Sequence, residues 1–401
     1  MPKLIRVVAL TVSSELGGTE RVLLDLAKHH RDLGLDLSVV LPKDGPLMKE
    51  LEGYGVATHV VMPPNHLLSM SRTTKNPLRY LQILPALLKW ASRLRNSATV
   101  KEADLIYSIG FKTHLVSCLL RSKPKVWHLH EFPPRRTAFL WRTLGRVVPA
   151  KLIANSTSVK DAWQTIRQKH DAVPIALNGV DLDRFKPQPP TKWIHQELDI
   201  PKGQLLLGMP AVFASWKGHV EVMEAFLDIQ NEFPNLDLVF VGGPIYDTTT
   251  EKNFSRQLEQ RLQNAPPDEN GRQRVHTLPF QRDVERVYPE FEITLHYSLR
   301  PEPFGRVVIE SMACGVPVIA ADEGGPREIM QAGQQVCGWL APSRDVSSLT
   351  QTLRQALSST SAEKEKLALE VRRRAEESFS SLRFASDVLE VFQNVTEDEA
   401  G

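Results

Sequence analysis

The segment Arg300–Ala320 reads RPEPFGRVVIESMACGVPVIA, and the interpretation of the whole chain starts from it. It predicts a loop, a helix that opens near Phe304, and a buried strand over Val316–Ala320. Glu310 is the single charged residue within Val307–Ala320. An ionised carboxylate in such an apolar run is costly unless another group hydrogen-bonds to it.

A second carboxylate, Glu302, comes just before this helix. Pro303 suits entry into a helix, and Gly305 lets a ligand approach the backbone closely. Because the first N–H groups of a helix attract anions, the stretch predicts a phosphate seat between two carboxylates. A nucleotide sugar, with hydroxyls on both sides of a diphosphate, fits that arrangement. The alternative is that Glu310 is only a helix charge, paired with Arg306 at i,i+4.

The same stretch resembles the signature of glycosyltransferase family 4, the retaining enzymes of the GT-B fold. The matching residues are Glu302-Pro303-Phe304-Gly305, then Glu310, Met312–Ala320 and Gly324–Glu328. The resemblance implies an α/β fold of two doubly wound Rossmann-like domains that face a cleft. It also implies a C-terminal helix that crosses back to the N-terminal domain.

Repeated strand-helix units along the chain agree with two parallel sheets. We expect an N-terminal acceptor-binding domain over residues 1–190 and a C-terminal nucleotide-sugar-binding domain over 191–380. The crossing helix and an acidic tail occupy 381–401. Asn178–Lys186 resembles the family's segment before the linker, and prolines follow it. Asp181 and Asp183 could instead be the metal-binding pair of another glycosyltransferase class, which we consider wrong.

The resemblance also implies residue roles. Glu302, Lys217 and His130 are the expected catalytic residues. Donor binding is expected of nine residues: Gly17, Gly18, Lys217, Gly243, Phe280, Phe304, Gly305, Arg306 and Glu310. Lys217 and the helix terminus would neutralise the diphosphate, so we expect no metal and no cofactor. The family usually has an arginine where this chain has Val212, so Arg306 or Arg300 would have to substitute.

The N-terminal half begins with a strand over Leu4–Leu10 and a helix over Glu20–Arg31, with Thr19 as the expected N-cap. Gly17-Gly18 between them is consistent with a ligand near a helix N-terminus, or with a tight turn. His130 ends a later strand, where function usually lies in an open α/β sheet, and His128 is expected to pack in the core.

Charge is unevenly spread, because residues 66–170 hold 19 Lys and Arg but 4 Asp and Glu. Two basic amphipathic helices are predicted there, over Asn76–Arg95, kinked at Pro85, and over Arg135–Arg146. Such helices can lie on an anionic membrane, or can be ordinary packed helices with a solvated basic face. Nucleic-acid binding is not expected, since no stacking platform accompanies the charge.

The three cysteines lack metal-ligand spacing and favour a cytoplasmic protein. The basic helices would allow it to lie at the inner face of the plasma membrane. We therefore predict a retaining glycosyltransferase of cell-envelope or exported glycan synthesis. Its acceptor would be a glycan, a lipid-linked molecule or a small molecule. A GT-B phosphorylase or epimerase and a non-catalytic nucleotide-sugar-binding module are the alternatives.

Overall fold

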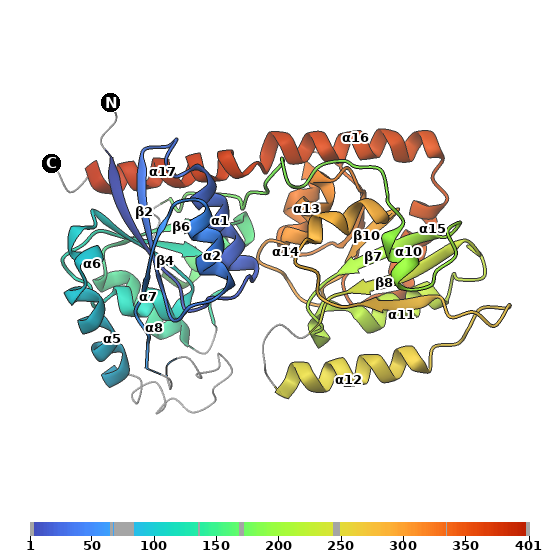
Figure 1. Ribbon diagram of the computed structural model, residues 1–401, viewed down its shortest axis with the longest axis horizontal. Coiled ribbons are helices and arrows are strands. Elements are labelled where there is room, and N and C mark those ends of the chain that lie inside the picture. The colour runs from blue at the N-terminus through green and yellow to red at the C-terminus, as the bar shows by residue number, and fades with distance from the viewer. Residues whose placement is uncertain are drawn as a thin grey trace. The chain divides into compact units, whose positions relative to one another are not determined.

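The computed structural model describes residues 4–64, 67, 84–134, 137–167, 172–243, 249–333 and 335–397 (Figure 1). The chain divides into two compact units. Unit 1 comprises Met1–Gly179 and Ser381–Gly401, and unit 2 comprises Val180–Ser380. Residues 76–83, Arg135 and Arg136 of the two predicted basic helices, and residues 398–401 of the acidic tail, lie outside the described residues.

Unit 1 is built on a six-stranded parallel sheet of order β3-β2-β1-β4-β5-β6. Its strands are β1 (Ile5–Leu10), β2 (Leu35–Leu41), β3 (Ala57–Val60), β4 (Leu105–Ile109), β5 (Lys125–Leu129) and β6 (Ala150–Ala154). Its helices are α1 (Gly18–His29), α2 (Pro46–Gly53), α5 (Leu84–Asn96), α6 (Ala98–Glu102), α7 (Phe111–Ser117), α8 (Ala138–Val147), α9 (Thr157–Arg167) and α17 (Ser381–Glu397).

Unit 2 has a second six-stranded parallel sheet, of order β14-β11-β10-β7-β8-β9. Its strands are β7 (Leu205–Pro210), β8 (Leu236–Val241), β9 (Val275–Leu278), β10 (Ile293–His296), β11 (Val318–Ala321) and β14 (Trp339–Ala341), with a small hairpin of β12 (Gln331–Ala332) and β13 (Gln335–Val336). Its α-helices are α10 (Trp193–Glu197), α11 (His219–Leu227), α12 (Thr249–Gln263), α13 (Arg306–Ala313), α14 (Gly324–Met330), α15 (Val346–Leu357) and α16 (Ser361–Ser378). Three short 3₁₀ turns are η2 (Ser215–Lys217), η3 (Val284–Arg286) and η4 (Tyr288–Glu290).

Both sheets have the Rossmann order, in which the chain reverses direction across the sheet beside its first strand. Successive residues of β1 face opposite sides, so Val7 and Ala9 enter one core with α1, while Val8 and Leu10 enter another with α5. A strand buried on both faces reads as a continuous apolar run, which explains why these strands could be predicted. The predicted fold class is confirmed.

The C-terminal helix α17 belongs to unit 1 (Figure 1). Phe392 packs edge-on against Tyr107 of β4, with ring centroids 5.1 Å apart, and Phe384 stacks on His128 of β5 at 5.9 Å. His29 Nε2 of α1 lies 2.8 Å from Ser381 Oγ at the start of α17. The return of the chain to the first unit is therefore held by core packing.

The units divide between Gly179 and Val180, earlier than the boundary near residue 190 that the sequence suggested. The segment that leaves unit 1 and the segment that returns to it meet there, because Val180 N donates a hydrogen bond to Phe379 O at 2.7 Å. A Cβ on Gly179 would lie 2.6 Å from Ser381 Cα. The proline-rich run after Phe185 is thus part of unit 2, not a linker.

One local prediction was wrong. Thr19 is not the N-cap of α1, because the helix starts at Gly18 and Gly17 occupies the cap position without a side-chain hydrogen bond. The kink expected at Pro85 stays a prediction, because the described part of α5 begins at Leu84 and the residues just before it lie outside the described ones.

Candidate functional site

Two loops of unit 2 meet at the point where its strand order reverses. Strand β7 leads into the loop that carries Lys217, and the neighbouring strand β10 leads into the loop that carries Glu302. Ligands of open α/β sheets bind beyond the carboxyl ends of the strands at this switch point. The topology therefore brings together two residues that are 85 positions apart in sequence.

Glu302 and Lys217 form a direct ion pair. Lys217 Nζ donates to Glu302 Oε1 at 2.7 Å and to Oε2 at 2.8 Å, with little of either side chain exposed. Ser298 Oγ donates to Oε2 at 2.6 Å, and His296 Nε2 lies 3.0 Å from the same oxygen. The sequence analysis identified the first two residues but missed His296 and Ser298. Their signal was their place at the end of β10, at the switch point.

The Glu302 carboxylate is held in its ionised form. Burial by itself raises the pKa of this carboxyl group, but the charges and hydrogen bonds of Lys217 and His296 outweigh burial. The pKa of Glu302 is therefore well below its usual range. At neutral pH this side chain can stabilise developing positive charge or act as a nucleophile.

Glycines fix the backbone around this pair. Gly218 adopts φ +79°, and a Cβ there would lie 2.0 Å from Tyr297 O of the opposite loop. Gly325 N donates to Glu302 O at 2.8 Å, and a Cβ on Gly325 would lie 2.3 Å from Phe304 O. Any larger residue would push the Glu302 loop away, which gives the Gly324-Gly325 part of the motif a steric role.

Helix α13 begins directly after the Glu302 loop. Gly305 precedes it with φ +105°, a conformation that favours glycine, and Phe304 is buried beside it. Val308 N is bonded to Gly305 O at 3.0 Å. The first turn of α13 is thus the expected anion-attracting helix end.

Glu310 lies one turn further along α13 and is buried. Tyr288 Oη donates to Glu310 Oε2 at 2.7 Å, and Arg306 Nε donates to Oε1 at 3.3 Å. The i,i+4 pair with Arg306 that the sequence offered as an alternative is therefore present. Tyr288 could not be foreseen, since it comes from η4 and reaches α13 through tertiary packing.

The other expected donor residues of unit 2 lie at strand ends. Gly243 follows β8, and its carbonyl accepts from Phe213 N at 3.1 Å. Phe280 follows β9 and is about half exposed. Asp181, the rejected metal ligand, instead accepts hydrogen bonds from the backbone N–H groups of Asp183 and Arg184.

His130 belongs to unit 1, directly after β5, and is buried there. Its ring centroid lies 4.0 Å from that of His128. His128 is fully buried, and its Nδ1 is hydrogen-bonded to Tyr107 Oη, so His128 packs in the core. Burial, followed by the charges of His130 and His114, holds the pKa of His128 well below its usual range.

Gly17 and Gly18 form the N-terminus of α1, and neither residue adopts the left-handed backbone conformation. Glu20 in the first turn is partly buried, and burial, reinforced by the charge of Glu131, raises its pKa to about 6. The sequence analysis did not identify Glu20 or Glu131, the residue that follows His130. Among the described residues, no group of three or more His, Cys, Asp or Glu could hold a metal ion.

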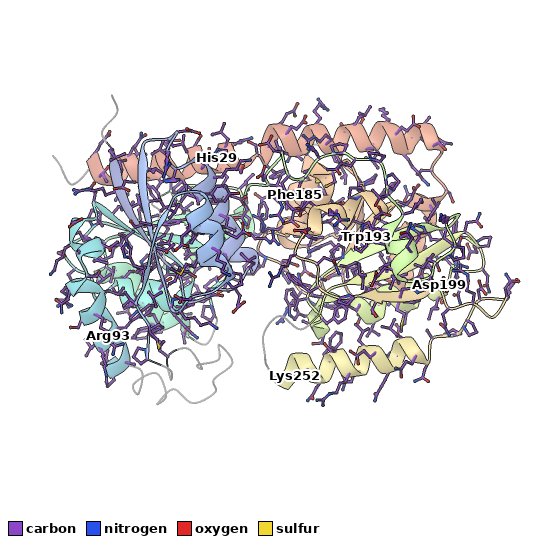
Figure 2. The ribbon with its side chains drawn as sticks, viewed as in Figure 1. His29, Arg93, Phe185, Trp193, Asp199 and Lys252 are labelled. Carbon is purple, nitrogen blue, oxygen red and sulfur yellow. The ribbon has the colours of Figure 1, made fainter. Side chains whose placement is uncertain are left out.

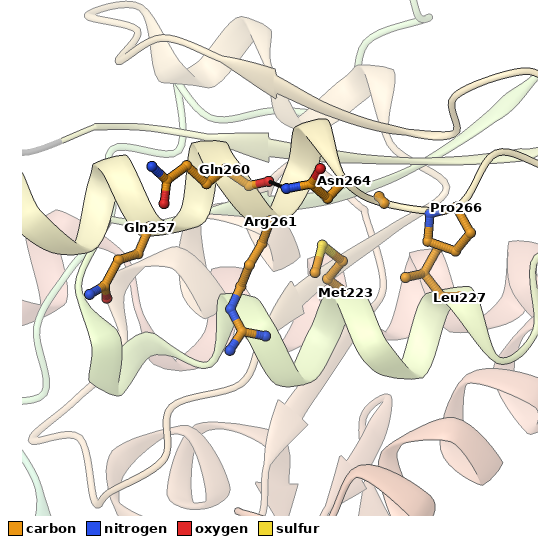
Figure 3. A pocket seen from close by; sticks show the side chains of 8 residues that line it. Met223, Leu227, Gln257, Gln260, Arg261, Asn264 and Pro266 are labelled. Atoms are coloured by element: carbon orange, nitrogen blue, oxygen red, sulfur yellow. Dashed lines mark hydrogen bonds between the residues drawn. The ribbon is translucent and has the colours of Figure 1, made fainter.

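A separate hollow of about 600 Å³ lies between α11 and α12 (Figure 3). Its lining residues are Met223, Leu227, Gln257, Gln260, Arg261, Asn264, Ala265 and Pro266. Arg261 reaches toward α11, where its Nη1 lies 3.8 Å from Glu224 Oε1. None of the predicted site residues lines this hollow, so it is not the phosphate seat.

Two Rossmann-like sheets in one chain, with the site of unit 2 at a switch point, define a protein of the GT-B class. Residues 191–377 match the family model "Glycosyl transferases group 1", and residues 16–184 match "Glycosyltransferase Family 4". The two models together cover most of the chain. The chain therefore belongs to the group 1 glycosyltransferases of the family 4 type.

Curated relatives are distant and match in part. Spore coat protein SA of Bacillus subtilis is 25% identical over 54% of this chain and 57% of its own length. The D-inositol 3-phosphate glycosyltransferase of Jonesia denitrificans is 28% identical over 61% of this chain and 57% of its own. The chain thus spans little more than half the length of these relatives.

Solved structures share the fold over nearly the whole chain. HepE from Anabaena, crystallised with UDP-glucose, has a TM-score of 0.79 and 24% identity, and the match covers 97% of this chain and 100% of that one. A glycosyltransferase from Rickettsia africae has a TM-score of 0.78 and 20% identity, over 98% and 99% of the two chains. At such identities the likeness establishes the fold.

Proposed function

We propose that this protein transfers a sugar from a nucleoside-diphosphate sugar to an acceptor hydroxyl, with retention at the anomeric carbon. The observation that carries the proposal is the Lys217–Glu302 ion pair beside the N-terminus of α13, with Glu310 one turn further on. A cation, a helix end and two carboxylates in one unit match the phosphates and hydroxyls of such a donor.

Each group then has a role. Lys217 and the N–H groups after Phe304 neutralise the departing diphosphate, so the reaction needs no metal ion and no cofactor. Glu310 accepts hydrogen bonds from the ribose hydroxyls, and it does so once Arg306 and Tyr288 make room at its oxygens. Glu302 faces the donor sugar as nucleophile or as stabiliser of an acceptor's front-face attack. His130, in unit 1, serves the hydroxymethyl side of that sugar.

A donor screen tests this function. Sugars carried on uridine, guanosine, adenosine and thymidine diphosphate are each added with EDTA present. The concentration of each donor is about one hundred times its Kd, which is taken to be in the micromolar range. Binding to the folded state alone at that ratio stabilises it by about 2.7 kcal/mol, so we expect one base to raise the melting temperature clearly. The bound donor should be consumed only when an acceptor is added, and NMR should show a product of unchanged anomeric configuration.

Three results would contradict the proposal: no shift with any donor, consumption without an acceptor, or inversion of the anomeric centre. Consumption dependent on inorganic phosphate would instead identify a phosphorylase. Loss of transfer in EDTA, restored by a divalent cation, would overturn metal independence alone.

For the acceptor we propose a glycan or lipid-linked molecule of cell-envelope or exported glycan synthesis, met at the cytoplasmic face of an anionic membrane. Helix α8 of unit 1 supports this, because Phe139 is 80% exposed and Val147 is 69% exposed, with Arg146 exposed beside them. Neither α8 nor α5, where Arg93 is labelled in Figure 2, contains an acidic residue. Apolar side chains framed by arginines suit an anionic lipid surface.

A vesicle assay checks the membrane contact. We expect sedimentation with phosphatidylglycerol vesicles at low salt and little with phosphatidylcholine vesicles. Exchanging Phe139 for Ser together with Arg146 for Glu should reduce binding to the anionic vesicles about tenfold or more, since each basic residue near the surface contributes about 1 kcal/mol. The matched control is Lys202→Ala, an exposed lysine of unit 2.

Equal binding by the double variant, or no binding by the wild type, would refute this contact. Within the described residues, none of the helices combines the length and the apolar character that spanning a bilayer requires.

A further inference from the structure

The cations closest to the proposed phosphate seat are already matched by carboxylates. Lys217 is paired with Glu302, and Arg306 is paired with Glu310. These pairs add no net charge, whereas the diphosphate of a donor brings about two negative charges. Electrostatic stabilisation of that group calls for a cation that is not already compensated.

Arg300 meets this requirement. Its guanidinium Cζ lies 4.8 Å from the centroid of the Trp216 ring, and Lys217 Nζ lies 4.4 Å from the same centroid. In the described part of the chain, no carboxylate lies within ion-pair distance of Arg300, and the side chain is exposed. One indole ring therefore carries both an engaged and an uncompensated cation.

The backbone fixes this arrangement. Leu299 N donates to Trp216 O at 2.8 Å, which joins the loop after β10 to the loop after β7 next to both cations. Pro301 limits the conformations of the segment between Arg300 and Glu302. Arg300 is thus tied to the same switch point as Lys217. Val212, five residues before Lys217, is uncharged and cannot supply a second cation.

We infer that Arg300, held over Trp216, is the second cation for the donor diphosphate, and that Trp216 is the residue that positions both cations. The inference rests on the proposed function and deepens it within unit 2. Arginine suits the task because its planar fork can bind two phosphate oxygens at once, whereas lysine acts as a point charge.

Isothermal titration with the diphosphates of uridine, guanosine, adenosine and thymidine, and with inorganic pyrophosphate, tests it. We expect Arg300→Ala to raise the Kd for the nucleoside diphosphate that the wild type binds, by about tenfold to a hundredfold. Binding of the matching nucleoside, which has no phosphate, should be unchanged. Arg300→Lys should recover part of the loss, and Trp216→Leu should reproduce most of it.

The matched control is Arg373→Ala on α16, an exposed arginine whose Nη1 lies 3.8 Å from Glu377 Oε1. Unchanged diphosphate binding in Arg300→Ala, or equal losses for the nucleoside and its diphosphate, would overturn the inference while leaving the proposed function intact. A wild-type protein that binds none of the diphosphates would overturn both.

Discussion

Replacing Lys217 with alanine should lower the rate of sugar transfer by about a hundredfold to a thousandfold. This is the loss seen when one preorganised group that stabilises developing negative charge is removed from an active site. Among the residues that the structure describes, Lys217 is the one cation that contacts both oxygens of Glu302, so its loss also removes the main group that keeps the pKa of Glu302 low. Both the leaving group and the carboxylate would lose their stabilising charge.

Glu302→Gln should cause a loss of similar size, since it removes the negative charge that faces the donor sugar. Because the two side chains contact each other, the double variant should be only slightly worse than either single one. The rate of sugar transfer is measured at saturating donor as the release of nucleoside diphosphate, which chromatography quantifies. Lys202→Ala, an exposed lysine before β7, is the control.

Melting temperature and donor affinity separate chemistry from folding in these variants. A variant that stays folded and binds donor yet transfers slowly supports a catalytic role. Near-normal transfer by folded Lys217→Ala, or fully additive losses in the double variant, would contradict the role proposed for this pair.

Acidification below pH 6.5 should lower the stability of unit 1 more than that of unit 2. Burial, followed by the charge of His130, lowers the pKa of His114 to about 3, and His128 is lowered well below its usual range. In unit 2, burial, followed by the charge of Lys217, lowers the pKa of His219 to about 3. The unfolded chain binds these protons near pH 6.5 and the folded chain does not, so stability falls as the pH drops below 6.5.

For the two histidines whose folded pKa is about 3, the size of the effect follows from that difference. His114 lowers the stability of unit 1, and His219 that of unit 2, by about 2 kcal/mol between pH 7 and pH 5. His128 adds to the loss in unit 1 in the same direction. Glu20 acts in the opposite direction, because its raised pKa makes the folded state bind the proton first. Protonation of Glu20 therefore adds about 1 kcal/mol to the stability of unit 1 between pH 7 and pH 5.

Tryptophan emission can follow unit 1 during acidification. Four tryptophans, Trp90, Trp127, Trp141 and Trp163, belong to unit 1 and are at most 3% exposed, whereas Trp193, Trp216 and Trp339 of unit 2 are partly exposed. We expect the urea midpoint of the emission shift to fall steeply from pH 7 to pH 5. Native emission and an unchanged midpoint at pH 5 would contradict this account.

His219→Leu provides a variant for unit 2. Neither ring nitrogen of His219 has a hydrogen-bond partner in the described part of the chain, and the ring packs among Phe213, Phe240 and Phe254. Leucine should therefore raise the melting temperature of unit 2 more at pH 5 than at pH 7.5, as calorimetry would show. His59→Gln on β3, where the side chain is partly buried, is the control.

The sequence by itself determined the two parallel sheets, the crossing helix and the Glu302–Glu310 motif. The strands predicted over Leu4–Leu10 and Val316–Ala320 are observed as β1 (Ile5–Leu10) and β11 (Val318–Ala321), because strands buried on both faces are continuous apolar runs between polar loops. The roles of the motif residues remain proposals, to be tested by the Lys217 and Glu302 variants.

Tertiary structure alone decided which groups contact those residues. Tyr288 contacts Glu310, which is 22 residues away in the sequence, and Lys217 contacts Glu302, which is 85 residues away. It also decided that Gly17 rather than Thr19 caps α1, and that the units divide at Gly179, where the outgoing and returning chains meet. Periodicity and motif spacing record which face a residue occupies, whereas a pairing between distant residues depends on strand order and packing.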